Sequence, residues 1–325
     1  MCSSVSWRDC INDNIPLILD GGLSTHLEAQ GFELGGDPLW SARLLHTDPE
    51  AIKDAHYRFL LSGSNVISTA TYQASVEGFV QHLGVTCDRA RELLMSGVHL
   101  AKDALQKFQS ENKDEPRHGS VAGSIGPYGA FLHDGSEYTG DYAVNMNVED
   151  LMSWHRPQLA CLTAAGADII AFETIPSVRE AEALVQLLRE FPNTNAWLSF
   201  SCKDEKCISD GSLFSGAVQV ALKNPQIVAV GVNCCSPDLV EPVLDSAKTK
   251  LKPELSWVVY PNSGEQWDTH KGWLAQEKKT GSLSQFCEIW RRQGAGLIGG
   301  CCRVGPEEIA KLHQILKQKP SDKQS

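Results

Sequence analysis

Three cysteines of this chain have the residue type and the placement of metal ligands. Cys234 ends the apolar run Val228-Ala-Val-Gly-Val-Asn-Cys234, and the pair Cys301-Cys302 ends the run Gly296-Leu-Ile-Gly-Gly-Cys-Cys302. If these runs are neighbouring strands of one barrel, their ends bring three thiolates together. A zinc ion held by three protein ligands keeps its fourth position open, as catalytic zinc sites do. We therefore expect one zinc ion per chain and a thiol as its substrate.

The remaining cysteines are expected to have structural roles. Cys235 follows Cys234 directly and should point the other way, because side chains alternate along a strand. The chain has 11 cysteines, an odd number spread over its length, which favours reduced thiols and a cytoplasmic protein rather than a disulfide framework. The cysteines expected to be small buried hydrophobes or surface residues are Cys2, Cys10, Cys87, Cys161, Cys207 and Cys287.

Composition and charge exclude several classes of partner. The 325 residues are 42% hydrophobic and carry a net charge of -11, which disfavours sequence-independent binding to nucleic acid or anionic membranes. The N-terminus lacks a basic segment followed by an apolar one, and no apolar stretch reaches 18 residues. We expect a cytoplasmic protein that acts on small molecules, without nucleic acid or membrane partners.

Eight short apolar runs alternate with helical segments along the chain. Most runs are continuously apolar, as expected for parallel strands that are buried on both faces. The repeated strand–helix pattern predicts a single (β/α)8 TIM barrel, with one domain over residues 1–325 and an ordered core over about 12–318. The expected strands are Pro16 to Gly22, Asn65 to Tyr72, Ser120 to Gly126, Asp168 to Thr174, Ala196 to Cys202, Ile227 to Cys234, Trp257 to Asn262 and Ala295 to Cys301.

Three helix starts are visible in the sequence. Asp48 precedes Pro49 at the expected first position of a helix, and Gly305-Pro306 begins the last one with acidic residues in its first turn. Ser177 and Glu180 have the spacing of a capping box.

Polar residues gather at the ends of the expected strands, where barrel enzymes place their chemistry. Asp20-Gly21-Gly22 ends the first strand and Glu173-Thr174 ends the fourth, while Asn233 and Asn262 end the sixth and seventh. A buried carboxylate such as Glu173 is costly without a partner. No Lys or Arg lies in its strand, so a substrate ammonium is a candidate partner.

Other sequence patterns suggest other functions. Gly294-Ala-Gly296-Leu-Ile-Gly299 matches a dinucleotide fingerprint by letter, but it lies before and within a strand instead of opening a helix, so we reject it. Gly299-Gly300 before a helix N-terminus would suit a barrel lyase or isomerase with a phosphorylated substrate, although bulky cysteines follow. A non-catalytic zinc- or thiol-binding protein is the alternative from another class.

The ordered motifs resemble the zinc-dependent homocysteine S-methyltransferases over nearly the whole chain. The likeness is closest to the branch that uses S-methylmethionine or S-adenosylmethionine as methyl donor to make methionine. The motifs that carry it are Leu19-Asp-Gly-Gly22, Asp37-Pro-Leu-Trp-Ser-Ala42, Ala70-Thr-Tyr-Gln-Ala74, Gly123-Ser-Ile-Gly-Pro-Tyr-Gly-Ala130, Asp134-Gly-Ser-Glu-Tyr138, Phe172-Glu-Thr174, Gly231-Val-Asn-Cys234, Val259-Tyr-Pro-Asn-Ser-Gly-Glu265 and Gly299-Gly-Cys-Cys302.

The resemblance implies a role for each motif. Cys234, Cys301 and Cys302 match the family's zinc ligands, and zinc would deprotonate the homocysteine thiol. Asp20 to Gly22 and Glu173 would hold the amino-acid end of homocysteine, with Glu173 facing its ammonium and the glycine N–H groups facing its carboxylate. A sulfonium is already a good leaving group, so we expect no catalytic group beyond the metal site. Val304-Gly305 departs from the Thr-Thr that many relatives carry after the cysteines.

The resemblance also bears on the donor and on assembly. Betaine-using relatives carry tyrosines at the positions of Gln73 and Thr174, so we expect polar contacts from Gln73, Thr174, Asn262 and Glu265 to a sulfonium amino acid instead. Asn233 is a further expected substrate-binding residue. The segments Tyr128 to Asn147 and Asn262 to Gly281 are long enough to cover the site. The chain lacks the C-terminal arm through which betaine-using relatives oligomerise, which predicts a monomer.

Overall fold

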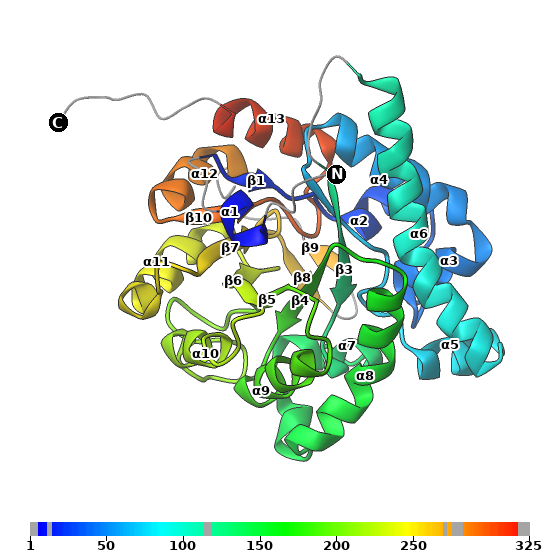
Figure 1. The fold of residues 1–325 in the computed structure, drawn as a ribbon, viewed down its shortest axis with the longest axis horizontal. Helices are drawn as coiled ribbons and strands as arrows, with labels where there is room; N and C mark the ends of the chain where they lie inside the picture. The colour runs from blue at the N-terminus through cyan, green and yellow to red at the C-terminus, as the bar shows by residue number, and fades with distance from the viewer. Residues whose placement is uncertain (1–5, 12–14, 114–118, 269–271, 275–281, 318–325) are drawn as a thin grey trace.

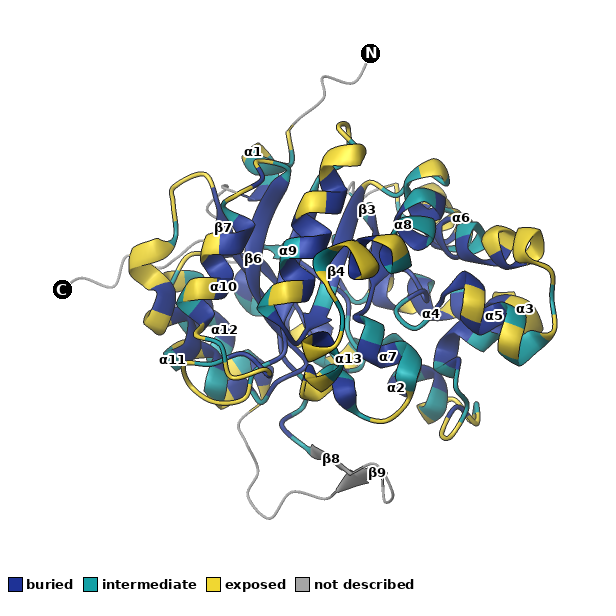
Figure 2. Ribbon diagram, turned by 90° about the horizontal axis from the view of Figure 1, so that it is seen from below, coloured by how far each residue is buried: buried dark blue, intermediate teal, exposed yellow. Residues whose placement is uncertain are grey.

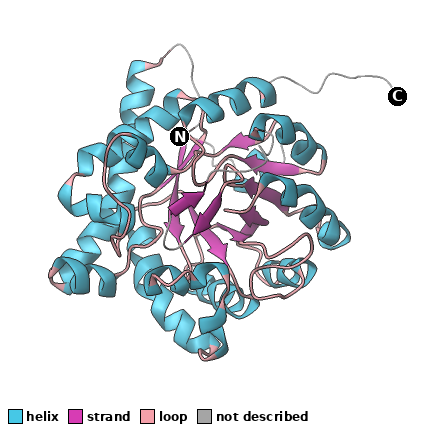
Figure 3. Cartoon of the chain, turned by 180° about the vertical axis from the view of Figure 1, so that it is seen from behind, coloured by secondary structure: helices cyan, strands magenta, loops and turns pink. Residues whose placement is uncertain are grey.

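Eight parallel strands form the centre of the molecule in a computed structural model that describes residues 6–11, 15–113, 119–268, 272–274 and 282–317. The strands lie in the order β1-β10-β7-β6-β5-β4-β3-β2, and a parallel bridge between Leu19 and Val66 joins the two ends of the sheet. The expected single (β/α)8 barrel is thereby confirmed (Figures 1 and 3). The barrel strands are β1 (Leu17–Ile18), β2 (Val66–Ser68), β3 (Ser120–Ile125), β4 (Ile169–Ile175), β5 (Ala196–Phe200), β6 (Ile227–Asn233), β7 (Ser256–Tyr260) and β10 (Ala295–Ile298).

Helices surround the barrel in chain order. Successive outer helices contact one another around the ring, and the last of them, α13, contacts α4. The outer helices are α4 (Pro49–Leu61), α6 (Cys87–Glu111), α8 (Val148–Ala164), α9 (Val178–Leu187), α10 (Phe214–Ala221), α11 (Pro237–Ala247), α12 (Leu283–Arg292) and α13 (Pro306–Leu316). Shorter elements are α1 (Trp7–Ile11), α2 (Leu23–Ala29), α3 (Leu44–Thr47), α5 (Val76–Leu83), α7 (Tyr128–Leu132), the antiparallel pair β8 (Gln266–Asp268) and β9 (Gly272–Leu274), and the 3-10 turns η1 (Trp40–Arg43), η2 (Ser136–Tyr138), η3 (Asp141–Val144), η4 (Leu188–Glu190) and η5 (Lys248–Lys250). None of the described helices is long and apolar enough to span a bilayer.

The apolar core lies between the strands and the helices, and the outward faces of the helices carry the exposed residues (Figure 2). Inside the barrel Trp197 is fully buried, and its indole N–H donates to the Tyr260 hydroxyl at 3.0 Å. A filled barrel interior leaves the space for ligands at the strand ends.

Two of the three predicted helix starts are confirmed. The Asp48 side chain accepts a hydrogen bond from the Ala51 N–H before α4, and Pro306 occupies the first turn of α13. The third prediction is half wrong. Ser177 does cap α9 by accepting from the Glu180 N–H, but the Glu180 side chain turns away to other partners.

The structure shortens most of the expected strands at their C-terminal ends. β1 ends at Ile18, and the carboxylate of Asp20 takes over the pairing with β2 by accepting the Ser68 N–H at 2.7 Å. The residues past the ladder are thus free to turn toward the barrel mouth. The expected limits of the ordered core near residues 12 and 318 lie outside the described residues, as do Cys2 and much of the segment Asn262 to Gly281.

Candidate active site

A cavity of about 90 Å³, here called the inner pocket, lies at the C-terminal ends of the strands. It brings together residues from β1, β2, β3, β4, β6, β7 and β10 or directly after them, at the end of the barrel where the sequence places the site. Its lining comprises Asp20, Gly21, Gly22, Leu23, Ser24, Thr25, Trp40, Ser41, Ser68, Thr69, Ala70, Tyr72, Ser124, Tyr138, Glu173, Thr174, Cys234, Tyr260, Gly300, Cys301 and Cys302.

The three predicted cysteines meet in the inner pocket. The Cys234 and Cys302 sulfurs lie 3.8 Å apart, and those of Cys301 and Cys302 lie 3.9 Å apart. All three sulfurs fall within 4.8 Å of one another, so together they could hold a metal ion. Cys235 lies outside the group, buried in the core beside Cys202, as the alternation of side chains predicts.

The cysteine cluster stabilises negative charge on one of its members. Hydrogen bonds from Cys301 and then Cys302 lower the pKa of Cys234. The hydrogen bonds that Cys301 and Cys302 make to the Cys234 sulfur raise their pKa values, because each bond holds the proton on the donating thiol; burial and repulsion from the Cys234 thiolate raise them further. A bound cation would remove this repulsion and allow all three thiols to ionise.

Asp20 is held rigidly at the floor of the inner pocket. Its side chain accepts from the Ser68 N–H at 2.7 Å and from the Ser68 hydroxyl at 3.2 Å. Burial is the largest cause that raises the pKa of Asp20 to about 8, and the nearby charge of Glu173 adds to it. Asp20 therefore ionises readily only when a positive charge is present.

Glu173 faces the same space from β4. It accepts hydrogen bonds from the Ser124 hydroxyl and from the Tyr260 hydroxyl, while burial raises its pKa to about 7. No Lys or Arg is among the residues that line the inner pocket. Two carboxylates and three thiols without a basic side chain leave the pocket short of positive charge, which a metal ion and an ammonium group would supply.

Left-handed backbone conformations concentrate around the site. Among the described residues, five that are not glycine have positive φ: Trp40, His133, Thr174, Cys234 and Arg303. Such conformations cost energy, especially for a β-branched residue such as Thr174, and they cluster where function requires them.

Thr174 is held in this conformation by Asn233. The Asn233 side-chain oxygen accepts from the Thr174 N–H at 2.7 Å, and its amide donates to the Thr174 hydroxyl at 2.8 Å. Asn233 is fully buried and does not line the inner pocket. In the structure its side chain positions Thr174, the residue after Glu173, and does not face the pocket directly.

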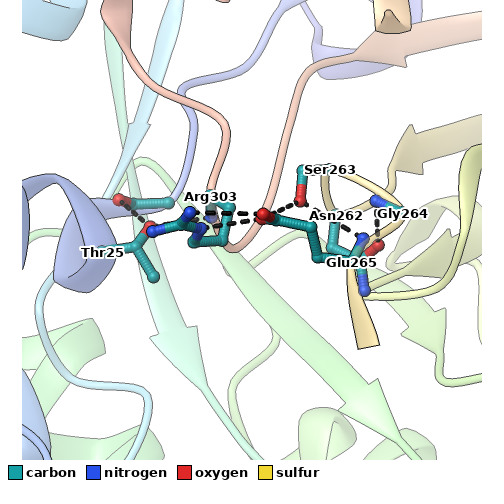
Figure 4. A network of polar contacts seen from close by, with 7 residues as sticks. Thr25, Asn262, Ser263, Gly264, Glu265 and Arg303 are labelled. Atoms are coloured by element: carbon teal, nitrogen blue, oxygen red, sulfur yellow. Dashed lines mark hydrogen bonds and ion pairs between the residues drawn. The ribbon is translucent and has the colours of Figure 1, made fainter. Parts of the chain in front are cut away.

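Two further expected contacts lie beside the pocket and not in its lining. The Asn262 side chain accepts from the Gly264 N–H at 2.8 Å, which closes a turn. Glu265 pairs with Arg303, its nearest Nε–Oε2 distance being 2.7 Å, and this ion pair lowers the pKa of Glu265 (Figure 4). The Asn262 side chain thus shapes the loop after β7, and Glu265 ties that loop to Arg303, next to Cys302.

The glycines of the first strand end make close backbone contacts. A Cβ atom on Gly21 would lie 2.1 Å from the Val304 carbonyl oxygen, so only glycine fits there. The Gly22 N–H donates to that same oxygen at 3.0 Å. It is therefore already engaged, and the expected carboxylate contact through both glycine N–H groups does not fit the structure for Gly22. Val304, which departs from the pattern of the relatives, contributes here through its main chain.

A second, larger cavity of about 260 Å³, here called the outer cleft, adjoins the inner pocket. Trp40, Tyr72, Tyr138 and Cys302 line both, so three aromatic rings surround the passage between them. The lining of the outer cleft comprises Glu28, Leu34, Gly35, Gly36, Asp37, Pro38, Trp40, Tyr72, Gln73, His133, Gly135, Glu137, Tyr138 and Cys302. Gln73, expected from the sequence, lies in this cleft.

The segment from Tyr128 to Asn147 supplies Glu137 and Tyr138, which sequence reasoning did not select. Instead of an irregular loop it forms α7, η2 and η3. The Tyr138 hydroxyl lies 3.5 Å from the Cys234 sulfur. The motif Asp134 to Tyr138 was recognised in the sequence, but nothing in its spacing showed that it would reach the cysteines from a different strand.

Glu180 of α9 anchors this segment from beneath. Its fully buried carboxylate accepts from the Tyr128 N–H at 2.7 Å, from the Tyr142 hydroxyl, and contacts His155 at 2.8 Å. The neighbouring Arg179 donates to the Val144 and Met146 carbonyls. Arg179 and Glu180, in the first turn of α9, thus hold the segment that brings Tyr138 to Cys234.

Comparison with known proteins identifies the family. The sequence profile of the family described as homocysteine S-methyltransferase matches residues 17–316. The chain belongs to the homocysteine S-methyltransferase family. Homocysteine S-methyltransferase YbgG of Bacillus subtilis is 41% identical over 93% of this chain and 95% of its own length. A Drosophila melanogaster protein named betaine-homocysteine S-methyltransferase is 40% identical over 94% of this chain and 95% of its own length.

Solved structures agree with this membership. The metallated form of the homocysteine methyltransferase MmuM from Escherichia coli has a TM-score of 0.84 at 38% identity and covers 94% of this chain and 98% of its own. The apo form of the same protein has a TM-score of 0.74.

Gly299 and Gly300 are explained by close packing and not by a bound phosphate. Added Cβ atoms would lie 2.5 Å from the Leu19 side chain and 2.2 Å from that of Val304.

Proposed function

We propose that this protein transfers a methyl group from a sulfonium donor to the thiol of L-homocysteine, and so produces L-methionine, with zinc as its metal. The observation that carries the proposal is the meeting of three thiols and two carboxylates in one pocket that no basic residue lines. Homocysteine carries a group for each half of such a pocket. Its thiol can bind the metal, and its ammonium can pair with a carboxylate. Membership in the family supports the same reading.

The spacing of the cysteines supports zinc. Sulfurs at the corners of a tetrahedron around zinc, with bonds of about 2.3 Å, lie about 3.8 Å apart. The Cys234–Cys302 and Cys301–Cys302 sulfur–sulfur distances in the structure are 3.8 and 3.9 Å. When bound, zinc would supply a strong Lewis acid that keeps the homocysteine thiol deprotonated at neutral pH. Cys234, Cys301 and Cys302 would hold it and leave one position for the substrate.

The carboxylates would orient homocysteine. Glu173 faces the pocket with the Ser124 and Tyr260 hydroxyls fixing its direction, and we assign it to the substrate ammonium. Asp20, held by Ser68, lies close enough to Glu173 for the charge of Glu173 to raise the pKa of Asp20. An arriving ammonium therefore lowers the pKa values of both groups and is held by a charge-assisted hydrogen bond.

The methyl donor would approach through the aromatic passage. The bond between the donor's sulfonium sulfur and its methyl carbon breaks as the new carbon–sulfur bond forms, and the neutral thioether leaves without a proton. The chain's task is to align the two sulfurs and to exclude water. Trp40, Tyr72 and Tyr138 line the junction of the two cavities and would place ring faces near the sulfonium charge.

The charge of the outer cleft favours S-methylmethionine or S-adenosylmethionine over betaine. Glu28, Asp37 and Glu137 line it, and no Lys or Arg does. Each sulfonium amino acid carries a net positive charge, whereas betaine is neutral overall. The three aromatic rings of the passage would suit the cationic centre of either kind of donor, so they do not discriminate between them. Because the Drosophila melanogaster relative is named for betaine, betaine must be tested directly.

The decisive experiment is methionine formation by the purified, zinc-loaded protein. Homocysteine would be supplied with S-methylmethionine, S-adenosylmethionine or betaine at equal concentration, and methionine measured by mass. We expect methionine from the first two and hardly any from betaine. Betaine matching S-methylmethionine would overturn the donor assignment. Zinc binding without turnover of any donor would favour a non-catalytic zinc- or thiol-binding protein. The proposal needs no partners other than small molecules. It also includes that the protein is a monomer and acts in the cytoplasm.

A further inference from the structure

The outer cleft contains two buried oxygen atoms that make no hydrogen bond within the described part of the chain. They are Gln73 Oε1 and Glu137 Oε2, and both residues line the cleft. The orientation of the Gln73 amide is set by its nitrogen, which donates to the Ala130 carbonyl at 3.1 Å. A buried acceptor without a donor is unfavourable, so each oxygen is a place where a ligand donor would be stabilised.

The other acidic residues of the outer cleft are already engaged. Asp37 pairs with Arg43 and accepts the Leu39 N–H at 2.9 Å. Glu28 accepts a hydrogen bond from Trp40. Glu137 is therefore the carboxylate of this cleft with capacity for a cation, and Gln73 offers a neutral acceptor in the same cavity.

The position of Glu137 relative to the cysteines is fixed by its neighbours. Its carbonyl accepts from the Ser201 hydroxyl at 3.2 Å, and the next residue, Tyr138, reaches the Cys234 sulfur with its hydroxyl. Tyr138 also lines both cavities. A donor whose sulfonium lies in the aromatic passage can thus extend its other end into the cleft where Glu137 and Gln73 lie.

We propose that Glu137 and Gln73 bind the primary ammonium group of the methyl donor, and that they select donors that carry one. The proposal rests on the proposed methyl transfer and assigns its donor contacts. A primary ammonium has three N–H donors, enough for both oxygens, whereas the quaternary ammonium of betaine has none. A site built to hydrogen-bond a group discriminates strongly against analogues that lack it, because its buried acceptors then stay unpaired.

The test compares two sulfonium donors that differ in the amino group. S-Methylmethionine carries the ammonium, and dimethylsulfoniopropionate does not. Glu137→Gln should lower kcat/KM for S-methylmethionine about 10- to 100-fold. The same variant should leave kcat/KM for dimethylsulfoniopropionate, the KM for homocysteine and the zinc content nearly unchanged. Gln73→Leu should act in the same direction with a smaller effect.

Asp141→Asn is the matched control, since Asp141 is an exposed acid of the same segment that lines neither cavity. It should leave both donors unaffected. An equal loss with both donors in Glu137→Gln would show a general disturbance and overturn the proposal, as would a rise in the homocysteine KM alone. If the wild-type protein forms no methionine, the proposed function fails, and calorimetric binding of S-methylmethionine to the wild type and to Glu137→Gln still decides this proposal: equal affinities would refute it.

Discussion

The inner pocket and the outer cleft differ in how the fold builds them. The inner pocket consists mainly of residues at the ends of barrel strands or directly after them, so the order of the strands in the barrel places these residues around one mouth. The outer cleft is made largely by the segments 28–40 and 133–138, and Glu180 and Arg179 hold the residues on either side of the second segment through contacts with Tyr128, Tyr142 and Val144. If the proposed function holds, recognition of the thiol substrate is part of the barrel scaffold, while recognition of the donor belongs to connections that can vary without altering the barrel.

The largest expected effect is the loss of a cysteine ligand from the inner pocket. Cys302→Ser should lose most of its zinc and lower methionine formation by more than about 100-fold, since the remaining two thiolates cannot complete the site. Elemental analysis of metal per chain measures the first effect. Cys235→Ser is the control, because Cys235 lies in the core and should retain its zinc. Full activity in Cys302→Ser, or in a metal-free preparation, would remove the basis for the mechanism.

The next effect separates the two substrates. Glu173→Gln should raise the homocysteine KM about 10- to 100-fold, because a charge-assisted hydrogen bond to the substrate ammonium contributes about 1.5 to 3 kcal/mol. Zinc content and the donor KM should stay near their wild-type values. If zinc fell while homocysteine affinity held, Glu173 would belong to the metal site and the division between the two cavities would need to be redrawn.

The dependence on pH sharpens the same division. Burial raises the pKa of Glu173 to about 7. Because only the ionised carboxylate holds an ammonium, kcat/KM for homocysteine should fall as the pH decreases through that value. The positive charge of bound zinc would shift the pKa of Glu173 back down, so the fall in kcat/KM should begin at or below pH 7. Profiles measured between about pH 5 and 9 should lose this inflection in Glu173→Gln. An inflection that persists unchanged in the variant would assign it to another group.

The smallest effect concerns the support of the outer cleft. Tyr142→Phe removes the hydroxyl that donates to the buried Glu180, and we expect the free energy of unfolding to fall by about 1 to 2 kcal/mol. The donor KM should rise while the homocysteine KM does not. Tyr57→Phe breaks a similar bond to Glu111 on the surface of α4 and α6, and it should affect neither KM. Equal rises in both KM values of Tyr142→Phe would mean that the two cavities are not independent.

The same contrast explains what the sequence could predict. The ends of apolar runs predict that Cys234, Cys301, Cys302, Asp20 and Glu173 lie together, and the structure places all five in the inner pocket, because parallel strands of one barrel must end at one mouth. Asn262 and Glu265 were expected in the site and lie beside it, since local partners engage them. Which polar side chains are already satisfied within the protein depends on contacts between distant segments, and strand order alone does not give these.

Glu137 and Tyr138 show the limit for the outer cleft. Their segment has no strand to fix its direction, and its course depends on Glu180 and Arg179, about 40 residues later in the chain. The residues from Ser177 to Glu180 predict a capping box, but in the structure only the Ser177 side chain caps the helix. A carboxylate two residues into a helix gives no sign in the sequence that it will accept hydrogen bonds from a loop.

The contact between Gly21 and Val304 has a consequence for synthesis on the ribosome. The first strand end and the last one meet through main-chain atoms, and the Gly22 N–H bonds to the Val304 carbonyl across 282 positions of the sequence. Two of the three cysteines of the metal site also follow the last strand. A growing chain therefore cannot assemble the metal site until its final barrel unit has left the exit tunnel. Metal loading must be a late event, and shortened products from premature termination would carry Asp20 and Glu173 without acquiring the metal that makes them useful.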